Sequence, residues 1–185
     1  IPEISGISAT NYVQFEPLSG DVSFSAYSAD NIVDMRNVGY IRFKNISFSL
    51  PETGVIRGIN PSLVRLNANS TGAQFLNCSF ADNSSSQLCT LLLVEGASNV
   101  VVDNCSFQGG QIGIDMAGTA SDIRATNNRI SHSEFSHQVN NAVSVSNQTD
   151  VVIDSNFMQD VTSNTSYILL AQHCYNNSRI IIFFR

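Results

Sequence analysis

One short pattern recurs along this chain and constrains its fold more than any other feature of the sequence. In residues 99–107 apolar and polar residues alternate, an Asn interrupts the run, and a short apolar segment follows. Similar segments follow one another about 23–32 residues apart when these residues are aligned: Asn45, Asn77, Asn104, Asn127, Ser155 and Phe183. A repeat of this length that is built from short strands is typical of a solenoid.

The composition is that of a globular, β-rich protein. Of the 185 residues, 43% are hydrophobic and 13% are charged, and this balance argues against intrinsic disorder. The formal net charge of −6 argues against a nucleic-acid partner, which favours a basic surface. No apolar run approaches the ~18–20 residues of a membrane span, so we expect none.

The repeats predict an all-β solenoid of about six to seven coils with almost no helix. Residues 1–20 form a lead-in segment or an incomplete first coil, and residues 21–185 form the solenoid. Coils stacked about 4.8 Å apart give a rod on the order of 30 Å long. The aligned inward positions of one strand are Phe43, Phe75, Val102, Ala125 and Ile153. The aligned positions just after the bend are Ile46, Cys78, Cys105, Asn128 and Asn156.

With its Asn at the bend, this repeat resembles the right-handed parallel β-helix of the pectate-lyase-like superfamily. The resemblance covers roughly residues 20–185 and implies the fold. It does not imply one activity, because this fold serves polysaccharide lyases, hydrolases, epimerases, phage tailspikes, adhesins and structural surface proteins.

The residues that enzymes of this superfamily use are not evident here. The resemblance implies a strand face with several carboxylates for calcium and a basic residue in the lyases, and paired Asp motifs with a Gly-His-Gly in the hydrolases; neither hydrolase motif occurs. The outward column before the bend is Lys44, Leu76, Asp103, Thr126 and Asp154. Asp103 and Asp154 are two coils, or about 9–10 Å, apart. That is too far to share a calcium ion and compatible with an inverting carboxylate pair, but two solvated strand residues are favoured.

Two further polar groups are candidates for binding or catalysis. His132, Glu134 and His137 could bind zinc or transfer protons, although a polar loop over residues 131–141 is the favoured interpretation. Asp115, Asp122, Arg124 and Arg129 could form a charged surface for a sugar or a partner. We predict no catalytic residue, metal site or cofactor from these patterns.

The cysteines bear on the register of the coils. Cys78 and Cys105 occupy equivalent places in adjacent coils, so their Cα atoms should lie about 4.8 Å apart, within the range of a disulfide. We predict this disulfide, with two buried thiols as the alternative. Cys89 and Cys174 fall about three coils apart, so each is buried singly or the register is wrong.

Eight Asn-x-Ser/Thr sequons and a first residue, Ile1, that is not Met favour a processed, extracellular or cell-surface glycoprotein. The sequons in or beside loops are the better acceptors: Asn69, Asn83, Asn147, Asn164 and Asn176. At the bends, an amide ladder that turns inward would block the others: Asn45, Asn77 and Asn104.

The apolar residues 180–184 expose a strand edge that needs a cover. We therefore expect the solenoid to continue into, or stack on, another unit. The first functional hypothesis is a secreted, glycosylated β-helix with a structural or adhesive role in a filament or larger surface protein, without enzyme activity. The alternative is a carbohydrate-active β-helix, lyase-like or hydrolase-like, or a carbohydrate-binding module without catalysis.

Overall fold

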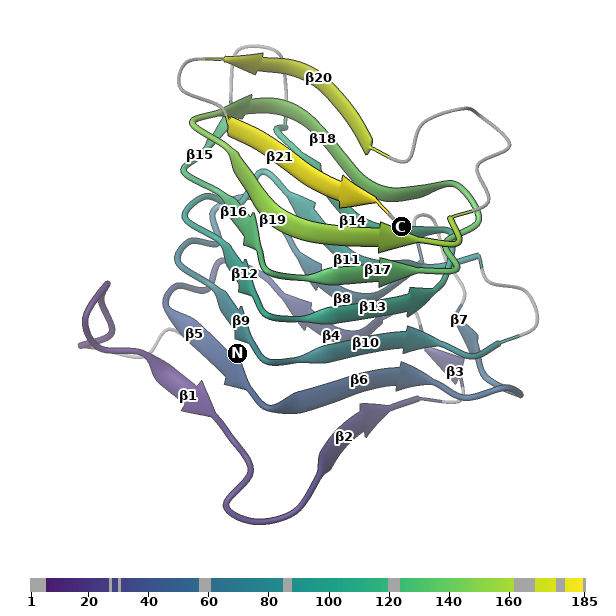
Figure 1. The fold of residues 1–185 in the computed structure, drawn as a ribbon. Coiled ribbons are helices and arrows are strands. Elements are labelled where there is room, and N and C mark those ends of the chain that lie inside the picture. The colour runs from purple at the N-terminus through teal and green to yellow at the C-terminus, as the bar shows by residue number, and fades with distance from the viewer. Residues whose placement is uncertain are drawn as a thin grey trace.

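The computed structural model of the chain is a right-handed parallel β-helix, as the repeat predicts (Figure 1). It describes residues 6–26, 28–29, 31–56, 61–84, 88–119, 124–161, 169–175 and 179–184. Within these ranges every regular element is a strand, and all strand pairs are parallel. No helix in them is long and apolar enough to cross a membrane.

Each coil has three sides. Side 1 consists of β4 (Asn31–Met35), β8 (Ser62–Leu66), β11 (Thr90–Glu95), β14 (Ile112–Ala117), β18 (Asn141–Thr149) and β20 (Leu169–Tyr175), with β15 (Ala125–Thr126) paired to the end of β18. Side 2 consists of β1 (Val13–Phe15), β5 (Ile41–Lys44), β9 (Gln74–Leu76), β12 (Val101–Asp103), β16 (Arg129–Ser131) and the first half of β19 (Val152–Gln159). Side 3 consists of β2 (Val22–Ser25), β6 (Ile46–Leu50), β10 (Ser79–Asp82), β13 (Ser106–Gly109), β17 (Glu134–Ser136) and the second half of β19. β21 (Arg179–Phe184) pairs with β19, and β3 (Ser28–Ala29) with β7 (Val55–Ile56).

The solenoid makes about five turns, fewer than the six to seven predicted. One reason is the number of strands on side 1. From its first strand, β4, to its last, β20, the chain advances from one strand to the next only five times, and each advance is one turn. The additional strands β1 and β2 lie on the other two sides, with no described side 1 partner before them.

Two repeats were aligned wrongly from the sequence. In the last coil Phe183 pairs with Phe157 and not with Ser155. The repeat that follows Asn104 is also shifted. Val101 pairs with Arg129, so the residue above Asn104 at the bend is His132, and Asn127 lies above Asn99 at the preceding corner. Both corners need a left-handed backbone, with φ of 56° at Asn127 and 49° at His132. An Asn suits either corner, so its presence alone does not tell them apart.

The corrected register changes three stacked columns. The inward column of side 2 continues from Val102 to Ile130, not to Ala125. The outward column continues from Asp103 to Ser131, not to Thr126. Beyond the bend, the backbone N–H of Cys105 donates to Ser133 Oγ (3.1 Å), so Ser133 takes the place expected for Asn128.

Stacked aromatic rings fill the interior. On side 3 the Phe48, Phe80, Phe107 and Phe135 rings lie parallel with centroids 4.6–5.0 Å apart. Each such contact contributes about 0.5–1.5 kcal/mol beyond the burial of its area. The β-helix is therefore held together by columns that repeat the same contact from coil to coil.

The Asn ladder lies on the outer surface of the bend, contrary to the inward ladder predicted. Asn77 Nδ2 donates to Asn45 Oδ1 (3.2 Å), and Asn104 Nδ2 donates to Asn77 Oδ1 (2.8 Å). All three side chains are exposed. In each coil the residue that follows the bend Asn is the one that is buried, so the amide is left outside.

Candidate functional site

The outer surface of side 1 carries charged side chains from three consecutive coils. Arg65 of β8 and Asp115 of β14 both pair with Leu93 of β11 in the strand register. Glu95 lies two residues further along β11, on the same face as Leu93, because side chains alternate along a strand. Stacking therefore brings together three ionisable groups that are far apart in the sequence.

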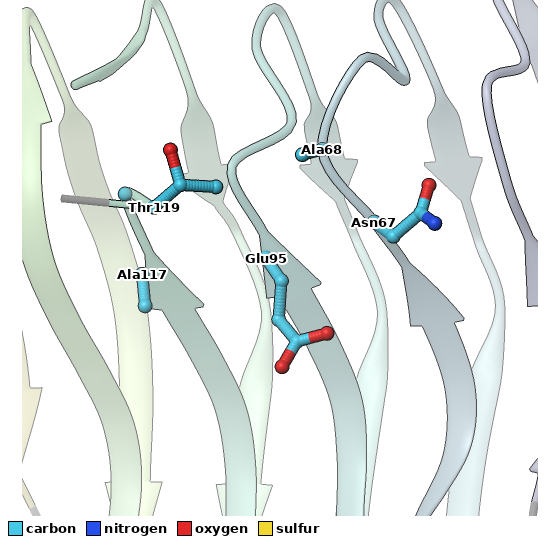
Figure 2. Close-up of a pocket in the computed structure, with 6 residues that line it drawn as sticks. Asn67, Ala68, Glu95, Ala117 and Thr119 are labelled. Atoms are coloured by element: carbon cyan, nitrogen blue, oxygen red, sulfur yellow. The ribbon is translucent and has the colours of Figure 1, made fainter. Parts of the chain in front are cut away.

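Glu95 and Asp115 line a groove made of two adjoining depressions. One has a volume of about 310 Å³ and is lined by Pro61, Leu88, Thr90, Leu93, Glu95, Gln111, Ile112, Asp115 and Ala117. The other has a volume of about 370 Å³ and is lined by Asn67, Ala68, Glu95, Ala117, Gly118 and Thr119. Both include Glu95 and Ala117, and Figure 2 shows the Glu95 side chain between Asn67 and Ala117.

A glycine shapes the end of this groove. Gly96 follows Glu95 with φ of +74°, and a Cβ there would lie 2.5 Å from Cγ2 of Thr119. Only a residue without a side chain fits this turn without displacing Thr119. The turn therefore keeps Glu95 at the end of its strand, beside the depression.

The two carboxylates of the groove have different environments. Arg65 forms an ion pair with Glu95, with Nε 2.8 Å and NH2 2.6 Å from Glu95 Oε2. Burial raises the pKa of Asp115; a hydrogen bond with Ser144 opposes this rise, and the charge of Glu95 adds to it. Pairs of carboxyl groups whose environments differ in this way serve as acid and base in hydrolytic enzymes.

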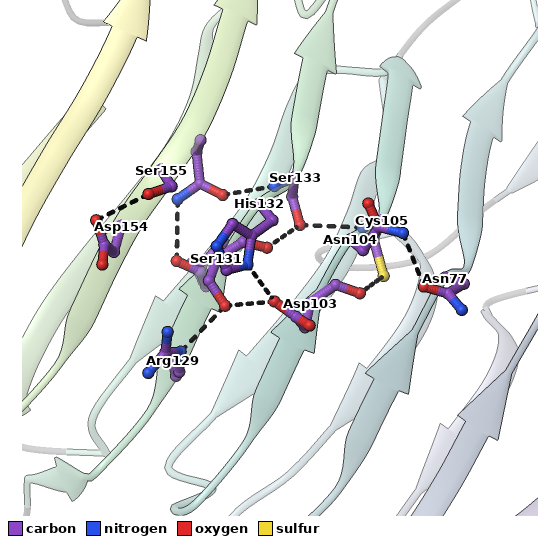
Figure 3. A network of polar contacts seen from close by, with 12 residues as sticks. Asn77, Asp103, Asn104, Cys105, Arg129, Ser131, His132, Ser133, Asp154 and Ser155 are labelled. Carbon is purple, nitrogen blue, oxygen red and sulfur yellow. Dashed lines mark hydrogen bonds and ion pairs between the residues drawn. The ribbon is translucent and has the colours of Figure 1, made fainter.

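A second polar cluster lies at the bend between sides 2 and 3 (Figure 3). His132 Nδ1 lies 2.8 Å from Asp103 Oδ1, to which Ser131 Oγ also donates (2.7 Å). Arg129 Nε donates to Ser131 Oγ (3.0 Å). Burial alone would raise the pKa of Asp103, but these hydrogen bonds and the nearby cations lower it.

The Asp103 and Asp154 side chains have separate partners. Ser155 Oγ donates to Asp154 (3.1 Å), and Arg179 lies 3.6 Å from it, whereas Asp103 binds His132 and Ser131. Asp103 thus contacts side chains of the next coil, as Asp154 does through Arg179, and the interpretation of the two as solvated strand residues stays a prediction.

The segment 131–141 is part of a coil and not a loop insertion. β17 occupies its centre, with His132 at the bend before the strand and His137 at the turn after it. Glu134 accepts a hydrogen bond from Gln159 (3.1 Å). Among the described residues no group of three His, Cys, Asp or Glu side chains could bind a metal ion.

The second predicted group is also dispersed. Asp115 is on side 1, Arg129 is on side 2, and Arg124 stacks over the Tyr175 ring at 3.8 Å. Asp122 lies outside the described residues. Of the three described residues in this group, only Asp115 lines the groove.

Cys78 and Cys105 are stacked in adjacent coils as buried, free thiols. Each Sγ faces carbonyl oxygens: Phe43 and Leu76 for Cys78 at 3.5 Å, Phe75 and Asp103 for Cys105 at 3.4 Å. Both side chains thus have the same orientation within their coils, and no disulfide joins Cys78 to Cys105 in this structure. The disulfide stays a prediction.

The other two cysteines are single thiols, and of the two only Cys89 is buried. Cys89 is buried with Sγ 3.1 Å from Asp82, and burial together with that carboxylate raises its pKa. Cys174 is half-buried on β20. No described contact joins the two.

The sequon side chains are accessible both in turns and at the bend. Asn69 and Asn83 are exposed, Asn147 is half-buried, and Asn164 and Asn176 lie outside the described residues. Because the bend ladder faces solvent, burial does not distinguish Asn45, Asn77 and Asn104 from the turn sequons. Glycosylation of all eight stays a prediction.

Sequence reasoning missed Glu95 and Arg65. The signal available was a charged residue that interrupts or ends an apolar strand: Arg65 within β8, and Glu95 at the end of β11. The partners could not be identified without the register, because the residues that meet come from different coils.

No family model and no curated protein matches this sequence. Among solved structures, the chain is similar to the crystal structure of a "putative glycosyl hydrolase from Parabacteroides merdae ATCC 43184". The TM-score is 0.53 and the sequence identity 8%, over 84% of this chain and 82% of that chain. At this identity the likeness establishes the shared fold alone.

Proposed function

We propose that this protein is a carbohydrate-active β-helix that hydrolyses a glycosidic bond in the groove of side 1. The observation that carries the proposal is the pair of carboxyl groups, Glu95 and Asp115, which differ in burial and in partners. The similarity to a protein named as a glycosyl hydrolase agrees with it.

The different environments of the two carboxyl groups lead us to assign them different catalytic roles. Asp115, whose pKa is raised by burial, donates its proton to the glycosidic oxygen as the bond from that oxygen to the anomeric carbon breaks. Glu95 accepts a proton from a water molecule whose oxygen bonds to the same carbon. Arg65 positions the Glu95 carboxylate.

The spacing of Glu95 and Asp115 predicts the stereochemistry of hydrolysis. Glu95 and Asp115 are diagonal neighbours on adjacent parallel strands, about 8 Å apart at the backbone from a strand spacing of about 4.8 Å and an offset of two residues. Inverting hydrolases separate their carboxyl groups by roughly 6.5–9.5 Å, because a water molecule must fit between acid and base. We therefore expect inversion at the anomeric carbon, measured by proton NMR of the first product formed.

The test is a screen for new reducing ends on a panel of plant, algal and microbial polysaccharides. Asp115→Asn and Glu95→Gln should each lower the rate by about 10²–10⁴-fold, because each removes one proton-transfer group. Gln108→Glu, on the outer surface of side 3, should leave it unchanged. Wild-type rates retained by both groove variants, or hydrolysis of no polysaccharide, would refute the proposal.

Stability measurements separate loss of catalysis from loss of folding. The raised pKa of Asp115 means that its contribution to stability is present below its ordinary value and is lost as the pH rises through the raised value. Asp115→Asn cannot ionise, so at pH 7 it should be at least as stable as the wild type in thermal unfolding.

A structural or adhesive role at a cell surface is the second candidate. Among the described contacts β1 and β2 each pair with one strand only, and Phe15 and Val22 on them are exposed. Such a strand edge favours contact with a second copy or a neighbouring domain. Filaments or oligomers that grow with concentration, seen by electron microscopy, would support this role, and monomers throughout would exclude self-association.

A further inference from the structure

Among the described residues around the groove, no cation is left unpaired. On the outer surface of β4, β8, β11 and β14 the described acidic residues are Asp34, Glu95 and Asp115, and Arg65 lies among them. Arg65 is already paired with Glu95, and Arg36, just beyond β4, is paired with Asp34. Among the described residues, Asp115 therefore has no cationic partner.

This arrangement disfavours an acidic substrate. A uronate carboxylate placed beside Glu95 would meet a like charge in a partly desolvated site, and beside Asp115 it would find no described cation to pair with. The available cation, Arg65, could pair with the substrate only by releasing Glu95. The groove thus selects against anionic chains by the charges that it presents.

The other lining residues suit uncharged sugar units. The larger depression offers the Asn67 amide and the Thr119 hydroxyl, and the smaller one the Thr90 hydroxyl and the Gln111 amide. Apolar walls of Leu93 and Ile112 accompany the polar groups of the smaller depression. A few polar groups on a mostly apolar wall are typical of a site for a neutral, hydroxyl-rich ligand.

The two depressions lie on either side of Glu95, along β11 and β14. A six-residue strand is about 20 Å long, so the groove is longer than a single sugar ring. A chain that occupied both depressions would place an internal bond at the carboxylates.

We propose that the groove binds a neutral polysaccharide chain along β11 and β14 and cleaves it at an internal bond. This inference rests on the proposed function and adds to it the class of substrate and the position of cleavage.

The test compares neutral polymers with acidic ones. Xylan, mannan, galactan and mixed-linkage β-glucan form the neutral set, and polygalacturonate and alginate the acidic set, each with and without added calcium. We expect at least one neutral polymer to be cleaved about tenfold or more faster than either acidic one. The early products should be oligosaccharides of mixed length.

A matched pair of variants tests the electrostatic reason. Gln111→Lys adds a cation to the groove, and Gln108→Lys adds the same cation to the outer surface of side 3, three residues earlier. Gln111→Lys should raise the rate on polygalacturonate relative to the neutral polymer several-fold, and Gln108→Lys should not. Equal effects of the two variants would overturn the assignment to the groove.

The outcomes separate this inference from the proposed function. Cleavage of acidic polymers alone, or single sugars as the first product, overturns the inference and leaves hydrolysis intact. If nothing is cleaved, affinity electrophoresis in gels that contain each polymer decides the substrate class. Retardation by a neutral polymer that Gln111→Glu weakens and Gln108→Glu does not supports the neutral site, and no retardation overturns it.

Discussion

Sides 1 and 3 of this solenoid are built from parallel strands in the same coils, yet their outer surfaces differ. On side 3, β6, β10 and β13 each place a Phe inside, directly after an outward Ser. On side 1 the outward positions of β8, β11 and β14 hold Arg65, Glu95 and Asp115, with no repetition from coil to coil.

This comparison distinguishes residues that recur because the fold requires them in every coil from residues that the fold does not require. A stacked Phe or a bend Asn recurs because each coil meets the same packing and backbone requirement. A carboxylate in one coil beside an arginine in the next meets no such repeated requirement. Departures from the repeat are therefore the first places to look for function.

The largest effect should come from breaking a side 3 column. Phe80 is 1% exposed, and its ring stacks between those of Phe48 and Phe107. Phe80→Ala should lower the free energy of unfolding by about 3–5 kcal/mol, because it leaves a cavity and removes these two stacked contacts and an edge contact with Phe75. Urea unfolding measures this, with the exposed Ser106→Ala as the control that should change it by less than about 0.5 kcal/mol. A loss below 1 kcal/mol for Phe80→Ala would show that the column is not what stabilises this side.

A smaller effect should come from the bend that joins sides 2 and 3. Asn77 has φ of 53° and both donates to and accepts from the amides of its neighbours in the ladder. Asn77→Ala should cost about 1–2 kcal/mol, because a left-handed backbone is unfavourable for Ala. Asn77→Gly relieves the backbone strain and loses only the ladder, so it should be the more stable of the two in the same urea experiment. The reverse order would contradict this account of the bend.

The smallest effect should come from the polar cluster at His132. The pKa of Asp103 is lowered, so its contribution to stability is present above its ordinary value of about 3.9 and is lost as the pH falls through the lowered value. Because both side chains are partly exposed, Asp103→Asn should cost only about 0.2–1 kcal/mol at pH 6. Urea unfolding from pH 6 to pH 3 should show this difference shrinking in acid.

His132→Asn sharpens the same comparison, since it restores the residue type of the other bends. If the repeat requires an Asn there, this variant should unfold with a free energy equal to or above that of the wild type, despite losing the contact with Asp103. A cost above 1 kcal/mol would mean that His132 belongs to the structural repeat.

The sequence by itself determined the parallel β-helix, its strand periodicity and the bend Asn of three coils, Asn45, Asn77 and Asn104. These follow from local rules: alternation along a strand, a left-handed corner that suits Asn, and an inward residue directly after it. Cys78 beside Cys105, and Phe43 beside Phe75, could be predicted because the coils that carry them match closely.

The tertiary structure decided which corner each Asn occupies and which outward side chains meet. Asn127 and His132 both fit a left-handed corner, and only the strand pairing of Val101 with Arg129 distinguishes them. Likewise, the groove unites Glu95 and Asp115 through the lengths of the turns between their strands, which local periodicity does not encode. A solenoid sequence specifies the content of each coil, and the stacking of unequal coils determines the site.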